Sequence, residues 1–102
     1  MAAKKEHVDY SSIPKETIIG GHTWRTIFKK MNGGNFGKCD PDTLTLSIKE
    51  GSPTSKAEET YIHELIHAIE HETKVGLSED EVERFSKLLY QVLKANNIQF
   101  KF

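Results

Sequence analysis

The stretch TYIHELIHAIEH, residues 60–71, lies at the centre of this 102-residue chain and sets its expected fold. Its apolar residues recur three and four positions apart, which predicts a helix with one apolar side. His63 and His67 are four positions apart on the opposite side, so their imidazoles project next to each other. We expect this helix to begin near Ser52–Pro53 and to extend past His71.

Residues 63–67, His-Glu-Leu-Ile-His, match the pattern H-E-x-x-H. Two imidazoles one helical turn apart can bind a single zinc ion, each at about 2.0–2.1 Å. Glu64 is adjacent to the pair and is placed to accept a proton from a zinc-activated water, as a general base. The motif therefore predicts a hydrolytic zinc site. The simpler alternative is a surface helix whose polar face carries histidines.

A catalytic zinc site needs a third protein ligand and an open position for water. His71 is eight residues from His63, about 12 Å along the same helix, and cannot share an ion with it. Glu70 is excluded for the same reason. The extended metzincin pattern is also absent, because Glu70 and Thr73 occupy the positions of its glycine and third histidine.

The next acidic segment is SEDEVE, residues 78–83, at the start of a second predicted helix. Relative to the apolar stripe of that helix, Glu81 lies at the edge of the stripe, Glu83 points away, and Glu79 sits in the first turn. Glu81 is therefore the predicted third ligand. Ser78 and Glu81 also match a capping box, which leaves open a purely structural role for Glu81.

The N-terminal half predicts strands. Residues 17–28 are rich in β-branched and aromatic side chains and are interrupted by Gly20–Gly21, which indicates two strands with a bend between them. The glycine-rich residues 32–42 are expected to form a loop. Residues 43–48 alternate between apolar and polar side chains, which predicts a strand buried on one face.

A second helix is expected over residues 79–95, with Ser78 as its N-cap. Strands followed by two helices predict a small α+β fold. The length is that of one domain over residues 1–102. Residues 1–15 are polar and are expected to form a loosely ordered arm.

Composition excludes several classes of function. The formal net charge of −1 provides no attraction to nucleic acid or anionic lipid. There is no apolar run near 18 residues and no signal-peptide pattern at the start, so no membrane association is expected. Cys39 is the one cysteine in the sequence, which excludes an internal disulfide and fits a reducing compartment. A cytoplasmic location is the expectation.

HELIHAIEH followed by LSEDEVERFSKLLYQVLKANN resembles the small phage-type and bacterial metallopeptidases related to the ImmA/IrrE group. These are gluzincin-like proteins with H-E-x-x-H on one helix and a glutamate ligand on the next. Residues 81–86 are similar to the group's E-A-N-x-F-A signature, which carries the glutamate ligand onto Glu81. Val82, Glu83 and Ser86 depart from that signature. The resemblance covers roughly residues 55–96.

The resemblance implies a zincin-like fold in which antiparallel strands precede the active-site helix and a C-terminal helix follows it. It also implies a zinc metallopeptidase with His63, His67 and Glu81 as ligands and Glu64 as general base. An edge strand in such enzymes pairs with an extended peptide substrate, and residues 43–48 are the candidate strand. A specific regulator, such as a repressor, is one candidate substrate.

Two other functions remain open. The chain could be a non-catalytic regulatory or binding module that keeps a structural zinc for stability. It could also be a metal-free helical interaction domain. For a peptidase, the group that stabilises the oxyanion is not selected by the sequence. The candidates are Tyr61, His22, His71 and Tyr90. Cys39 is expected to be a bystander rather than a ligand.

Overall fold

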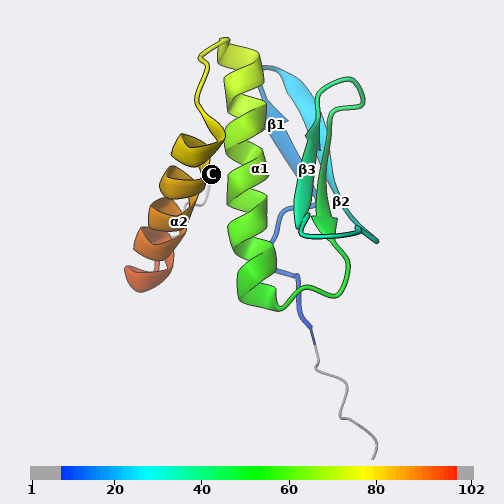
Figure 1. Cartoon of the computed structure of the whole chain (residues 1–102), viewed down its shortest axis with the longest axis vertical. Coiled ribbons are helices and arrows are strands. Elements are labelled where there is room, and N and C mark those ends of the chain that lie inside the picture. Colours follow the sequence, from blue (N-terminus) through cyan, green and yellow to red (C-terminus); the bar gives the residue numbers. More distant parts are fainter. Residues whose placement is uncertain (1–7, 99–102) are drawn as a thin grey trace, which may run out of the picture.

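The computed structural model describes residues 8–98. Four strands precede two helices, which confirms the predicted α+β class (Figure 1). The elements are β1 (Glu16–Ile19), β2 (His22–Lys29), β3 (Gly37–Asp40), β4 (Thr45–Lys49), α1 (Thr54–Thr73) and α2 (Glu79–Ala95). The predicted turn at Gly20–Gly21 joins β1 to β2, and both glycines have positive φ.

The strands form one mixed sheet in the order β1-β2-β4-β3. The two outer pairs, β1 with β2 and β3 with β4, are antiparallel, as the resemblance implied. The central pair, β2 with β4, is parallel. It is parallel because the chain passes from β2 to the far edge, forms β3 there, and returns through a tight turn into β4.

The third strand was not predicted, because residues 32–42 read as a loop. β3 occupies Gly37–Asp40 and forms the edge of the sheet, so β4 lies inside the sheet. The expectation that residues 43–48 form an edge strand is therefore wrong. The expectation that this strand is buried on one face is also wrong, since Thr45 and Ser47 are buried together with the apolar side chains.

The core lies between the sheet and α1. Trp24 from β2, Leu46 and Ile48 from β4, and Ala57 and Ala68 from α1 are completely buried there. The small alanines allow α1 to approach the sheet closely. α2 packs on α1 rather than on the sheet, so α1 is the middle layer of the molecule (Figure 1).

α2 begins at the predicted residue, and Ser78 is its N-cap. The choice of Glu81 as a ligand assumed that the apolar stripe of α2 faces α1, but the helix is rotated differently about its axis. Val82 and Ser86 are buried, whereas most of the stripe is exposed, with Phe85 and Leu88 each 62% exposed. Because Ser86 is small, α2 can lie close to α1 along the face that carries Val82 and Ser86.

The predicted N-terminal arm is held to the fold over the part that the structure describes. Ile13 is buried in the core, and the Tyr10 hydroxyl donates a hydrogen bond to the Ser52 carbonyl. Residues 1–7 of the arm lie outside the described residues. Within residues 8–98, no helix is long and apolar enough to cross a membrane.

Candidate metal centre

His63 and His67 lie next to each other on α1, as the i, i+4 spacing predicts. Their ring centroids are 5.0 Å apart and the rings meet edge to face. The Nε2 atom of each ring faces one carboxylate, that of Glu79. His63 Nε2 is 2.8 Å from Glu79 Oε1, and His67 Nε2 is 3.2 Å from Glu79 Oε2. One carboxylate from α2 thus spans the histidine pair.

These three residues form a candidate metal site. One potential ligand atom from each of His63, His67 and Glu79 lies within 4.8 Å of the other two. In a tetrahedral zinc site with bonds of about 2.0–2.1 Å, neighbouring ligand atoms are about 3.3 Å apart. The three donors therefore need only a small movement to meet one ion. Two imidazoles and one carboxylate also leave a fourth position for water.

Glu79 reaches the histidines because of where α2 begins. Ser78 caps the helix, so Glu79 is its first residue and lies over the middle of α1. The side chain is 72% exposed, which leaves the site accessible from solvent. Partial burial would raise the pKa of Glu79, but the hydrogen bond with His63 and the charge of His67 lower it. Glu79 is thus held as a carboxylate, the form that binds metal.

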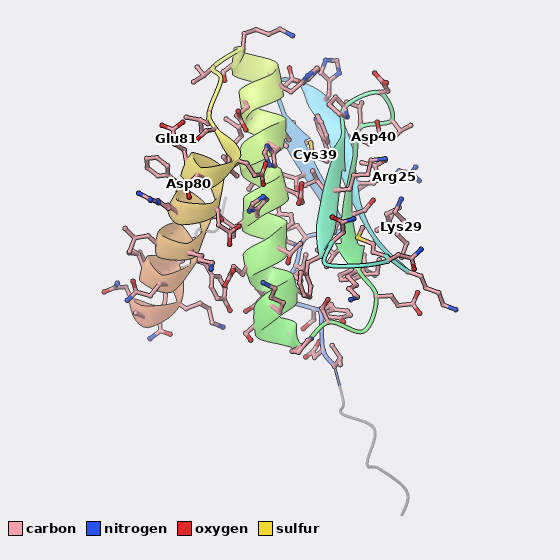
Figure 2. All side chains as sticks on the ribbon, in the orientation of Figure 1. Arg25, Lys29, Cys39, Asp40, Asp80 and Glu81 are labelled. Atoms are coloured by element: carbon pink, nitrogen blue, oxygen red, sulfur yellow. The ribbon has the colours of Figure 1, made fainter. Side chains whose placement is uncertain are left out.

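Glu81, the predicted third ligand, has the structural role that the sequence left open. Its carboxylate accepts the Ser78 backbone N–H at 2.8 Å, and the Ser78 hydroxyl accepts the Glu81 N–H at 3.1 Å. These bonds of the capping box lower the pKa of Glu81. Figure 2 shows Glu81 on the side of α2 away from α1. The structure therefore brings Glu79, and not Glu81, to the two histidines.

A further carboxylate lies at the other nitrogen of each imidazole. His63 Nδ1 is 3.1 Å from Glu83 Oε2, and His67 Nδ1 is 2.8 Å from Glu70 Oε1. A histidine that binds metal through Nε2 keeps its proton on Nδ1, which can then donate to such a carboxylate. Glu83 lies opposite the apolar stripe of α2, as predicted, but that stripe is largely exposed, and the face that carries Glu79 and Glu83 is turned to α1.

Glu64, the predicted general base, is 6% exposed and lies against β3. Burial raises the pKa of Glu64, and the nearby His63 and His67 partly oppose that effect. Gly37 allows this approach of β3 to α1. A Cβ atom at Gly37 would lie 2.5 Å from Thr60 Cγ2 and 2.8 Å from Glu64 Oε2, too close for any other residue without a shift.

Two cavities meet at His63 and define a cleft between β3 and the helices. A cavity of about 590 Å³ extends past Cys39 toward the connection between the helices. A second, of about 370 Å³, extends past Phe36 and Lys56. Four residues line both cavities, namely Gly37, His63, Glu64 and Glu79. The candidate metal site thus lies at the middle of an open groove.

The open edge of β3 forms one wall of this groove. The Lys49 N–H donates to the Phe36 carbonyl at 2.8 Å, which sets the hydrogen-bonding phase of the antiparallel β3–β4 pair. By the alternation of such a ladder, the backbone groups of Lys38 bond to β4, whereas those of Gly37 and Cys39 point outward. Backbone donors and acceptors that point away from β4 therefore line this side of the groove.

The oxyanion candidates and Cys39 differ in whether they line the groove. Tyr61 is buried with its hydroxyl 2.7 Å from Thr17 Oγ1, and Tyr90 donates to Glu58. Of the four oxyanion candidates, His71 lines the larger cavity. Cys39 also lines it, but burial, together with the charge of Glu64, raises the pKa of its thiol to about 12. It is not among the converging ligand atoms.

Comparison of the chain with protein-family models, with curated proteins and with solved structures found no match. What the structure supports directly is an α+β fold that carries a candidate metal site of His63, His67 and Glu79.

Proposed function

We propose that this chain is a zinc-dependent metallopeptidase in which His63, His67 and Glu79 hold the metal. The observation that carries the proposal is the convergence of these three side chains beside a buried carboxylate, in an open groove. A structural zinc site uses four protein ligands, whereas a catalytic one uses three and leaves a position for water. The group of three therefore favours the catalytic class.

Zinc fits the donors better than magnesium or calcium, because those hard cations prefer all-oxygen ligands. When bound, zinc would supply the Lewis acidity that lowers the pKa of water and polarises a substrate carbonyl. The remaining chemistry belongs to the protein. The Glu64 carboxylate accepts a proton from the attacking water and passes it to the nitrogen of the leaving amine.

An extended peptide is the substrate that suits the groove. The outward backbone groups of Gly37 and Cys39 can pair with a peptide main chain, as an added strand does at a sheet edge. Such pairing would lay the peptide along β3 and across the two histidines. Main-chain hydrogen bonds give affinity that depends little on the side chains of the peptide. The cavities on either side of the metal site would therefore set the preference for particular peptide side chains.

The proposal is tested with Glu64→Gln and a matched control on the same helix. Glu72→Gln is suitable, because Glu72 lies against Gly20 near the β1–β2 turn and not in the groove. Each protein is loaded with one equivalent of zinc and incubated with a mixture-based library of fluorogenic peptides. Cleavage products are identified by mass spectrometry.

Glu64→Gln is expected to bind zinc as the native chain does and to lose roughly 10²–10⁴-fold in cleavage rate, the usual contribution of a general base. Glu72→Gln is expected to cleave normally. Cleavage by Glu64→Gln at the native rate would contradict the proposal. A native chain that binds zinc and cleaves no peptide would indicate the non-catalytic module with a structural zinc.

A further inference from the structure

Glu70 joins the two parts of the candidate metal site through its two carboxylate oxygens. Glu70 Oε1 is 2.8 Å from His67 Nδ1, while Glu70 Oε2 accepts the backbone N–H of Leu77 at 2.8 Å. The side chain is 16% exposed, so both bonds are largely shielded from water. His67 provides one metal ligand, and Leu77 is two residues before Glu79, which provides another.

In the described structure, the segment between the helices is held by a long hydrogen bond from the Val75 N–H to Thr73 Oγ1, at 3.4 Å, and by the shorter bond from the Leu77 N–H to Glu70. α1 ends at Thr73, and the C-cap residue Lys74, with a φ of 61°, turns the chain out of the helix. Residues 75, 76 and 78 are exposed, and Leu77 is partly buried. The Leu77 N–H bond to Glu70 therefore fixes the approach of this segment to α2, and with it the position of Glu79.

We propose that Glu70 is a positioning residue that sets the spacing between His67 and Glu79, and that this spacing determines how tightly the site binds metal. The inference rests on the proposed metal function of these residues. Glu70 would fix the His67 ring with Nδ1 as the donor and Nε2 toward the metal. By the same carboxylate, it would hold the start of α2 at the correct distance.

The geometry requires a carboxylate, because both partners are donors once metal is bound. The two donors face different oxygens of Glu70, so a glutamine at position 70 in the same geometry would present its carbonyl oxygen to one donor only. Its amide group would face the second donor. Glu70→Gln should therefore weaken the site, and Glu70→Ala should weaken it further by removing both bonds.

The test compares the native chain with Glu70→Ala, Glu70→Gln and the control Glu72→Gln. Zinc affinity is measured by competition with a chromophoric chelator, below the unfolding temperature of each metal-free protein. The visible absorption spectrum of the cobalt(II)-loaded protein reports the ligand geometry. The melting temperature of the metal-free protein reports stability separately.

We expect Glu70→Ala to lower zinc affinity by roughly 10–100-fold, the usual effect of losing a carboxylate behind a metal-binding histidine. The cobalt spectrum should also change, with Glu70→Gln intermediate and Glu72→Gln native-like. A purely structural role would lower the melting temperature and leave affinity and spectrum unchanged, which would overturn the proposal.

If Glu70→Ala does not fold, the test rests on Glu70→Gln. A native zinc affinity in Glu70→Gln would then overturn the proposal. If the native chain binds neither zinc nor cobalt, the proposed metal function is wrong, and the role of Glu70 falls with it. If the native chain binds metal but the Glu70 variants bind it equally well, only the role of Glu70 is wrong. The two failures are therefore distinguishable.

Discussion

The α1–α2 pair is joined at two places that differ in their balance of charge. At the end away from the metal site, Glu58 of α1 accepts hydrogen bonds from the Ser12 and Tyr90 hydroxyls. Lys94 Nζ lies 3.4 Å from the same carboxylate. One negative charge thus meets one positive charge and two neutral donors. This junction is satisfied within the chain.

At the other place, two imidazoles lie among an excess of carboxylates. The carboxylates at or beside the two rings are those of Glu64, Glu70, Glu79 and Glu83. Lys87 Nζ lies 3.2 Å from Glu83 Oε1, so one of these carboxylates already has a cation beside it. Even with Lys87 counted and both imidazoles protonated, one negative charge remains unbalanced. A divalent cation would reduce this excess, whereas at the Glu58 junction it has nothing to neutralise. The difference separates a junction whose charges are satisfied within the chain from the junction that carries the candidate metal site.

The largest expected effect of this difference is stabilisation by metal. Free zinc at 100 times its dissociation constant should stabilise the folded chain by about 2.7 kcal/mol. For a domain of this size, that raises the melting temperature by about 10 °C or more. The measurement is thermal unfolding with and without zinc. The same shift in His63→Ala would show that the ion binds elsewhere.

Gly37→Ala should disturb the metal region from the side of the sheet. The added Cβ would collide with Thr60 and Glu64, at a cost of about 1–3 kcal/mol for overpacking. Denaturant unfolding measures that cost, and peptide cleavage should fall with it. Gly34→Ala is the matched control, because a Cβ there meets nothing within 4 Å. Equal stability and equal cleavage rates of Gly37→Ala and Gly34→Ala would contradict the close approach of β3 to Glu64.

Glu58→Gln should act on the other junction alone. Loss of a charged acceptor for two hydroxyls and of the pair with Lys94 is expected to cost about 1–2 kcal/mol. Urea unfolding at pH 7 gives this value. Zinc affinity should stay native, and a parallel loss of affinity would show that the two junctions are coupled.

The smallest expected effect is the pH dependence of that same cost. Burial raises the pKa of Glu58, but hydrogen bonds from Ser12 and Tyr90 and the charge of Lys94 outweigh it and lower the pKa overall. Because the pKa is lower in the folded state, the ionised carboxylate stabilises the fold at pH values above the unfolded-state pKa of about 4.3. This stabilisation is lost as the pH falls from there through the lower, folded-state pKa. The stability difference between the native chain and Glu58→Gln should therefore narrow between about pH 5 and pH 3. A constant difference would contradict this assignment.

The sequence predicted the parts of the fold that depend on local patterns. The spacing of apolar residues in residues 60–71 located α1, and Ser78 with Glu81 located the start of α2 through its capping box. β3 was missed because its residues, GKCD, lack β-branched and aromatic side chains. Its pairing with β4 and the position of Gly37 against α1 are tertiary effects that local propensity does not encode.

The candidate site was predicted in part for the same reason. His63, Glu64 and His67 lie within one turn of one helix, so their relative positions follow from helix geometry alone. The choice of Glu81 assumed that the apolar stripe of α2 faces α1, whereas Val82 and Ser86 face it and Phe85 is exposed. The four-residue spacing of Glu79 and Glu83 was a signal that these two share a face.

The role of Glu79 as a metal ligand is tested most directly by comparing zinc binding by Glu79→Gln and Glu81→Gln. Both substitutions change one first-turn carboxylate of α2 by the same chemical step. We expect Glu79→Gln to weaken zinc binding by more than about 100-fold, beyond the usual effect of a residue behind a ligand. We expect native zinc binding for Glu81→Gln. Native binding by Glu79→Gln together with loss in Glu81→Gln would contradict the assignment of Glu79 as the third ligand.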